Sequence, residues 1–346
     1  MSCHCKIGGI LLELWHLFRL TVYSFEICTK PKYMNTLNLI LVLSFCFLGV
    51  IAKAQDSIAD VIHPYRYETR YAQTDDSTKV AYLDEGTGDR TLIMIHGLAT
   101  YLPSWYPVFD ELKTANRCIV VDLPGYGRSS KGDYPGTMDF YAGIMKQLIE
   151  ALDIEKPVLV GHSMGSQIAI STVLDNPNLF EELILLAPAG FETFTEQQAA
   201  WLKSVTTVDV ICAATDEQVR ANWKLNFYEM PESVDFMISD RLAMKGASDF
   251  RNYGQAVVRS VSGMLDAPVY DRLKNLKTRT LVVYGENDSL IPNKYLNPNL
   301  TTKQVAEDAA GQIPKVSLKF IPECGHFITY DQPEVVSKLI DSFLNE

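Results

Sequence analysis

The chain has 346 residues, with a hydrophobic content of 47% and a charged content of 21%, which is ordinary for a globular protein of one large domain or two modest ones. Its net charge is −11, and the residues from Gln55 onward hold 26 basic and 40 acidic side chains, so nucleic acids and anionic membrane surfaces are excluded as natural partners of this part. Only Cys118, Cys212 and Cys324 follow residue 54. An odd and small number argues against a disulfide framework.

The N-terminal part carries an export pattern. Leu37–Ala52 is an almost uncharged apolar run, and an A-x-A pattern ends at Ala54. The run is short for a spanning helix, so we expect a signal peptide over residues 34–54 and a periplasmic or secreted mature protein. Met34 fits as the true start, which makes residues 1–33 upstream translation. The alternative is an uncleaved N-terminal anchor, which would be the only contact with a membrane.

From Tyr65 onward, short apolar runs alternate with helical patterns. The first two candidate strands are expected to pair as a hairpin around a turn at residues 74–77. Thr137 is placed to cap a helix, and the last helix is expected from about Pro333 to Leu344. The alternation predicts an α/β fold with a mostly parallel sheet and helices on both faces. The candidate strands are Tyr65–Ala72, Lys79–Asp84, Thr91–Ile95, Arg117–Val121, Val158–Val160, Leu183–Leu186, Thr280–Tyr284 and Val316–Ile321.

One long segment, residues 191–268, interrupts this alternation. It shows helical patterns, is rich in Trp, Phe, Tyr and Met, and contains no convincing strand. Most of these apolar side chains serve to pack its helices together. A connection of this length is far longer than usual between two strands and is typical of a lid. We therefore expect a helical cap over residues 191–268, inserted into a core made of residues 55–190 and 269–346.

The most informative stretch joins the candidate strand at Val158–Val160 to a helical pattern through Gly161, Ser163 and Gly165. Strand, G-x-S-x-G and helix together form a nucleophile elbow, in which a sharp turn exposes the serine hydroxyl. Side chains at the two glycines would crowd that turn. The elbow also places the backbone N–H of Met164 at a helix N-terminus, where it can bind a developing oxyanion. Ser163 is the predicted nucleophile.

A serine nucleophile needs a histidine base. After residue 54 the chain has only four histidines. His63 precedes the first strand, His96 fits better as a brace for its loop, and His162 is expected to point away from its neighbour in the elbow. His326 follows the last candidate strand, at the edge of the sheet where active sites of open α/β folds lie. By elimination, His326 is the predicted base.

The acid that orients this base should also follow a strand. Asp288 is the best candidate and Glu286 a weaker one, whereas Asp122 lies upstream in a glycine-rich turn and is expected to be structural. The second oxyanion donor should lie in the loop after the third strand, where the N–H of Leu98 follows a glycine. The predicted constellation is therefore Ser163, Asp288 and His326, with an oxyanion hole from Leu98 and Met164.

Taken together, these stretches resemble the α/β-hydrolase superfamily, in its cap-bearing, single-domain branch of serine hydrolases. The resemblance covers the chain from about Tyr65 to the end and implies an eight-stranded, mostly parallel sheet, a helical cap after the sixth strand, and neither a metal nor an organic cofactor. It rests on H-G-L at 96–98, D-L-P-G-Y-G-R-S at 122–129, G-H-S-M-G at 161–165, G-E-N-D at 285–288 and C-G-H-F at 324–327.

The resemblance favours a carboxylic ester hydrolase that forms an acyl-enzyme. Haloalkane dehalogenases and epoxide hydrolases carry aspartate where this chain has Ser163, so those activities are disfavoured. A carbon–carbon bond hydrolase of the same fold and a hydrolase-fold ligand sensor with slow turnover remain as alternatives. The apolar cap predicts an uncharged, mostly apolar small-molecule substrate, and the sequence leaves the oligomeric state open. Four cap cations are expected to serve surface solvation: Arg220, Lys224, Arg241 and Lys245.

Overall fold

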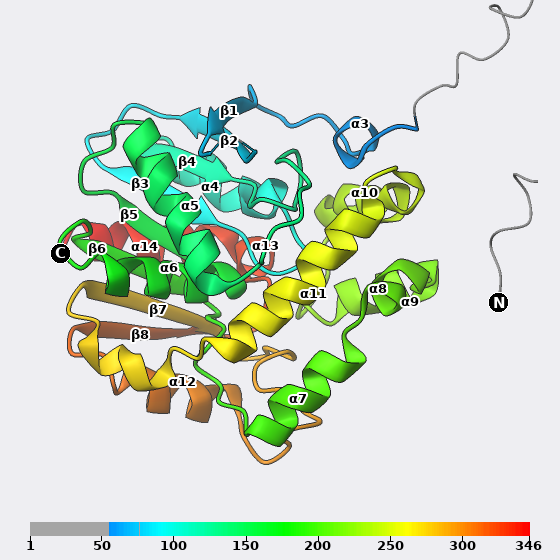
Figure 1. Cartoon of the computed structure of the whole chain (residues 1–346). Coiled ribbons are helices and arrows are strands. Elements are labelled where there is room, and N and C mark those ends of the chain that lie inside the picture. The colour runs from blue at the N-terminus through cyan, green and yellow to red at the C-terminus, as the bar shows by residue number, and fades with distance from the viewer. Residues whose placement is uncertain (1–54, 76) are drawn as a thin grey trace, which may run out of the picture. The chain divides into compact units, whose positions relative to one another are not determined.

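A computed structural model of the chain describes residues 55–75 and 77–346, so the predicted signal segment 34–54 and residues 1–33 lie outside the described residues. The described part is built on one eight-stranded sheet with the strand order β1-β2-β4-β3-β5-β6-β7-β8 (Figure 1). This confirms the predicted α/β class and the number of strands. The strands are β1 (Arg70–Gln73), β2 (Lys79–Glu85), β3 (Thr91–Ile95), β4 (Arg117–Val121), β5 (Val158–His162), β6 (Glu182–Leu186), β7 (Arg279–Gly285) and β8 (Val316–Ile321).

All neighbouring strands from β4 to β8 run parallel, whereas β1 and β2 pair antiparallel as the predicted hairpin and β2 also pairs antiparallel with β4. The prediction for the first strand was too long, because β1 begins only at Arg70. Instead of pairing in the sheet, the side chains upstream of it anchor to the core. The Tyr65 hydroxyl donates to Asp122 Oδ2 at 2.5 Å, and the Tyr67 ring packs edge-on against Phe109 at 5.2 Å.

The sheet separates two apolar cores, and alternate residues of each central strand contribute to opposite cores. Ile93 and Ile95 of β3 belong to one core, and Leu92 and Met94 to the other. The first core packs under α5 (Met138–Ala151) and α6 (Met164–Asp175), and the second under α4 (Tyr106–Leu112) and α14 (Pro333–Leu344). Helices of the described residues are all too short or too polar to cross a membrane.

Further short elements complete the core around these two layers. They are α3 (Ile58–Val61), η1 (Leu102–Trp105), η4 (Tyr270–Asn275), α12 (Thr302–Ala310) and α13 (Ile328–Asp331).

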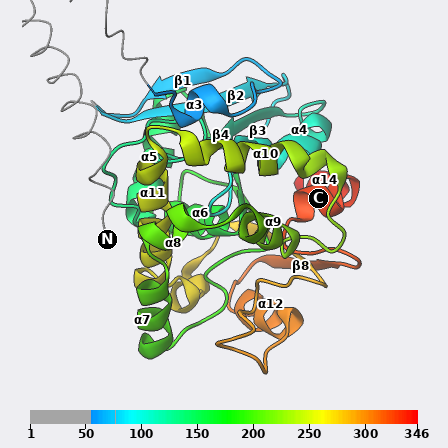
Figure 2. The same ribbon diagram turned by 90° about the vertical axis from the view of Figure 1, so that its right-hand side faces the viewer.

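Between β6 and β7 all regular elements are helices, and we refer to residues 191–268 as the cap segment. Figures 1 and 2 show its helices grouped on one side of the sheet rather than on its two faces. Threonine side chains cap the first three of them, each accepting a hydrogen bond from a first-turn N–H. Neither α7 nor α8 contains a buried residue. The elements are α7 (Glu196–Val205), α8 (Val208–Ala213), α9 (Asp216–Lys224), η2 (Glu232–Val234), α10 (Asp235–Ala243), η3 (Met244–Gly246) and α11 (Phe250–Asp266).

Residues 56–63 run along the cap segment, and we call them the N-terminal strap. Its side chains Ile58 and Ile62 are buried in the first core. The N–H of Ile58 donates to Asp249 Oδ1 at 2.7 Å, and the N–H of His63 donates to Asp240 Oδ1 at 2.8 Å. Because both aspartates belong to the cap segment, the strap connects that segment to the core.

Candidate active site

Ser163 lies on a sharp turn between β5 and α6. Its φ of 52° and ψ of −118° are in a region that non-glycine residues rarely adopt. The two flanking glycines are required by close packing. A Cβ on Gly161 would lie 2.4 Å from the carbonyl oxygen of Gly165, and a Cβ on Gly165 would lie 2.1 Å from the carbonyl oxygen of Ile95. The local geometry is thus the strand, turn and helix that the sequence pattern predicts.

The two amides predicted as oxyanion donors are both without a partner. Within residues 55–75 and 77–346, neither the N–H of Leu98 nor that of Met164 donates a hydrogen bond. Gly97 lies close to Ser163, since a Cβ added at Gly97 would be 3.2 Å from the Cβ of Ser163. The loop that carries Leu98 therefore passes directly beside the serine.

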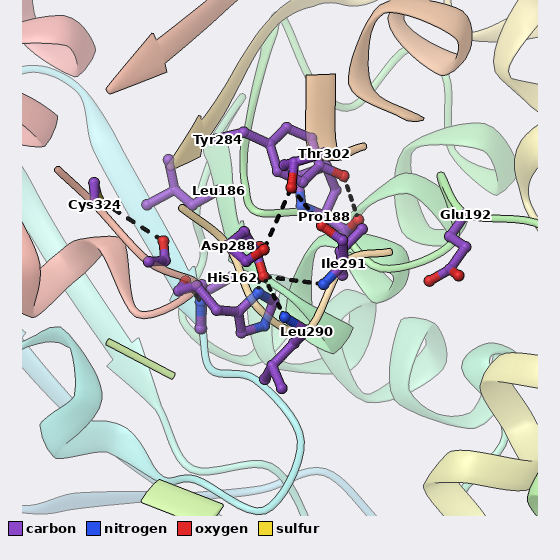
Figure 3. A network of polar contacts seen from close by, with 12 residues as sticks. His162, Leu186, Pro188, Glu192, Tyr284, Asp288, Leu290, Ile291, Thr302 and Cys324 are labelled. Atoms are coloured by element: carbon purple, nitrogen blue, oxygen red, sulfur yellow. Dashed lines mark hydrogen bonds and ion pairs between the residues drawn. The ribbon is translucent and has the colours of Figure 1, made fainter. Parts of the chain in front are cut away.

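His326 and Asp288 form a buried pair. The Nδ1–H of His326 donates to Asp288 Oδ2 at 2.7 Å, and both side chains are at most 5% exposed. The other carboxylate oxygen, Oδ1, accepts from the N–H groups of Leu290 at 2.8 Å and Ile291 at 3.0 Å (Figure 3). Glu286, the weaker candidate, is exposed. A carboxylate held by two amides orients the imidazole with its Nε2 free to accept a proton.

Ser163 and His326 line the same cavity, which has a volume of about 640 Å³. Its wall also includes Leu98 and the cap-segment residues Phe194 and Leu202. No hydrogen bond joins Ser163 Oγ to His326 in the described part of the chain. Such contacts are often long before a substrate binds. The structure thus brings the predicted nucleophile, base and oxyanion loop to one cavity, and the predicted acid is hydrogen-bonded to the base.

Asp122 and His96, which were predicted to be structural, accept hydrogen bonds from main-chain N–H groups of the surrounding loops. Asp122 is buried and accepts from the N–H groups of Leu102 and Arg128, each at 2.7 Å. His96 Nε2 accepts from the N–H of Leu123 at 3.1 Å. Neither side chain lines the cavity of Ser163.

The cap segment is bonded directly to the loop of His326. The N–H of Phe327 donates to the carbonyl oxygen of Asn226 at 2.8 Å, and the N–H of Tyr228 donates to Asp331 Oδ2 at 2.9 Å. The Phe227 ring packs edge-on against Phe327 at 5.2 Å. No sequence signal pointed to these contacts, because they join residues about 100 positions apart.

A second cavity of about 350 Å³ adjoins the first and shares Leu98, Asn226 and Phe327 with it. Arg241 lines this second cavity. Its Nη1 atom is buried without a hydrogen-bond partner, and its guanidinium lies 4.9 Å over the Phe250 ring. The expectation that Arg241 serves surface solvation is therefore wrong. Arg220 and Lys224 are exposed, as expected.

Glu192 is a carboxylate in the first cavity that the sequence did not single out. Its two oxygens accept from the N–H of Asn293 at 2.9 and 3.0 Å, and Asn297 Nδ2 donates to Oε1 at 2.6 Å. Burial raises the pKa of Glu192. Among the described residues, no group of three or more His, Cys, Asp or Glu side chains could hold a metal ion.

Comparison with known proteins agrees with this architecture. A hydrolase of Escherichia coli named for 2-hydroxy-6-oxononadienedioate and 2-hydroxy-6-oxononatrienedioate is 25% identical over 77% of this chain and 91% of its own length. The structure of a probable hydrolytic enzyme from Pseudomonas aeruginosa PAO1 has a TM-score of 0.74 at 24% identity, covering 84% of this chain and 98% of that one.

An esterase from Exiguobacterium antarcticum has a TM-score of 0.68 at 20% identity, covering 81% of this chain and all of that one. A family model described as alpha/beta hydrolase fold matches residues 90–333, which is well over half of the chain. The chain therefore belongs to the alpha/beta hydrolase fold family.

Proposed function

We propose that this protein is a serine hydrolase that cleaves esters or related acyl compounds through an acyl-enzyme. The observation that carries the proposal is the buried His326–Asp288 pair, at 2.7 Å, beside a cavity that also contains Ser163 on its strained turn. Hydrolase chemistry also fits the family and the names of the relatives.

Each group has a defined role in this reaction. His326 Nε2 takes the proton of Ser163 as the hydroxyl attacks the substrate carbonyl, and Asp288 stabilises the resulting imidazolium. The unpartnered N–H groups of Leu98 and Met164 bind the oxyanion. His326 then donates its proton to the leaving alcohol. In the second step His326 takes a proton from water as the water attacks the acyl-enzyme, and it returns this proton to Ser163 as the acid product leaves.

The test of the mechanism is Ser163→Ala. We expect this variant to fold as the wild type and to lose essentially all hydrolysis of p-nitrophenyl esters, by roughly 10⁶-fold in kcat. The wild type should also show a burst and stoichiometric labelling by a fluorophosphonate. Stoichiometric labelling with negligible steady-state turnover would instead favour a ligand sensor. Wild-type activity in Ser163→Ala would contradict the proposal.

For the substrate we propose an uncharged ester with a small to medium apolar acyl group. Glu192 supports this choice, because a carboxylate in the Ser163 cavity disfavours a second negative charge beside it. A panel of esters that varies acyl length and charge tests this choice. It is measured on the wild type and on Phe194→Ala, which removes a ring from the cavity wall and so enlarges the cavity. Trp223→Ala probes the adjoining cavity in the same way. A clear preference for anionic esters or for long-chain emulsions would contradict the choice.

Arg241 favours a second candidate, a carbon–carbon bond hydrolase. A buried guanidinium nitrogen without a partner, in the cavity next to Ser163, is suited to a remote carboxylate. The E. coli relative is named for dienedioate and trienedioate compounds, which carry such groups. Turnover of a 2-hydroxy-6-oxo-dienoate that exceeds ester turnover, and that falls in Arg241→Met, would favour this candidate. The matched control is Arg251→Met, at an exposed pair with Asp209.

A further inference from the structure

His162 is a buried residue of the site that the proposed mechanism does not use. It is the last residue of β5 and immediately precedes Ser163, and it is one of the residues that line the same cavity. Its Nε2 lies 2.9 Å from the main-chain carbonyl oxygen of His326. A carbonyl oxygen can only accept, so Nε2 carries the ring proton and Nδ1 presents a lone pair.

Three parts of the site meet at this imidazole. A Cβ on Gly97, in the loop of the oxyanion donor Leu98, would lie 3.1 Å from His162 Nδ1. The ring of Phe327 packs edge-on against it at 5.3 Å, and the ring of His326 lies 5.1 Å away. The orientation of the His162 side chain is therefore fixed by packing as well as by its hydrogen bond.

The charge state of His162 suits this place. Burial, and next the neighbouring His326, lower the pKa of His162 to about 3. The ring therefore stays neutral at pH values well above 3. A second imidazolium 5.1 Å from His326 would oppose the positive charge that His326 gains during the reaction. A neutral donor can hold the His326 loop without this repulsion.

The bond from His162 links the base to the strand that carries the nucleophile. The N–H of Gly325 bonds to Asp331 and that of Phe327 to Asn226, so the neighbouring amides are held by the base's own loop and by the cap segment. The His326 carbonyl is instead held from β5, which pairs with β3 and β6 in the middle of the sheet.

We propose that His162 is a positioning residue that fixes the main chain of His326 relative to Ser163 through its Nε2–H. The inference rests on the proposed serine hydrolase mechanism. Misplacement of a catalytic group by about 1 Å can reduce a rate by roughly 100-fold. The predicted effect of losing the bond is thus on the rate of the acylation step rather than on substrate binding.

A matched pair of amide variants tests this. The side-chain amide of His162→Gln reaches the place of Nε2 and keeps the donor, whereas that of His162→Asn reaches only the place of Nδ1. We expect His162→Asn to lower kcat for a p-nitrophenyl ester roughly 10- to 100-fold with little change in KM, and to slow fluorophosphonate labelling in parallel. His162→Gln should restore most of both rates. His162→Leu packs against Phe327 without a donor and replaces the Asn variant if that one does not fold.

Two results overturn the inference. One is a wild-type kcat in the folded Asn or Leu variant, which would show that the hydrogen bond of His162 does not affect the rate. The other is equal loss in the Gln and Asn variants. Ser163→Ala, measured alongside, separates the two proposals. If it is inactive, either result rejects the positioning role alone. If it retains wild-type activity, the proposed function fails and the inference with it.

Discussion

A buried histidine that remains neutral makes the stability of the folded protein depend on pH. The pKa of His162 falls from an ordinary value of 6.5 to about 3 on folding, so between these values the unfolded chain binds a proton that the folded chain does not. The free energy of unfolding therefore decreases as the pH falls below 6.5, until about pH 3.

This gives a prediction for His162→Gln, whose side chain does not titrate. Between pH 7 and pH 4.5, the wild type should lose about 2–3 kcal/mol more of its free energy of unfolding than the variant does. Urea denaturation at the two pH values measures the difference, and the carboxyl groups common to both proteins cancel. Equal losses in the two proteins would show that His162 is not held neutral.

The packing of α6 against β3 gives a prediction at the scale of one element. A methyl group on Gly165 would lie 2.1 Å from the main-chain oxygen of Ile95. Relieving this clash requires a shift of the main chain of β3, which destabilises the folded state. Gly165→Ala should therefore lower the melting temperature strongly and abolish ester hydrolysis. Gly143→Ala in α5 is the matched control, because nothing lies within 4 Å of the added methyl. It should stabilise the protein by about 0.5–1 kcal/mol. Similar effects on both would contradict this account.

The elements that the sequence predicted well are those whose signal is local. Strand β3 and the helix α14 were predicted with the bounds that the structure has. A strand buried on both faces leaves a continuous apolar run, and a helix buried along one stripe leaves a helical period. The strand at Tyr65–Ala72 was predicted too long, since its tyrosines satisfy the same apolar pattern by anchoring to side chains elsewhere.

The same distinction applies to the site. Ser163, Asp288 and His326 could be placed at one edge of the sheet from the sequence, because each follows a strand and the ends of parallel strands meet at one edge. The inward direction of Arg241 and the bond made by His162 depend on how distant segments pack. No local pattern encodes either one.

The connection between the N-terminal strap and the cap segment gives a prediction for the whole molecule. Asp240, whose side chain is 1% exposed, accepts from the N–H and the Nδ1 of His63 and from the hydroxyl of Tyr101. Asp240→Ala leaves these donors without an acceptor and should cost roughly 2–4 kcal/mol of the free energy of unfolding. The cap segment should also become easier to cleave by limited proteolysis.

The control for this prediction is Asp209→Ala, also in the cap segment. Asp209 makes an exposed pair with Arg251 at 3.1 Å, and exposed pairs contribute little. Its removal should leave both measurements close to those of the wild type. If Asp240→Ala behaves like Asp209→Ala, the strap does not hold the cap segment to the core.

The hydrogen bonds that join Asn226 and Tyr228 to the loop of His326 have a consequence for how a substrate enters. Lifting this part of the cap segment would break bonds beside the base, so opening here would also disturb the loop that carries His326. The helices α7 and α8, which contain no buried residue, can move at smaller cost. Entry on their side would leave the base assembled, and the population of the open state would then set the apparent affinity without lowering the rate of acylation.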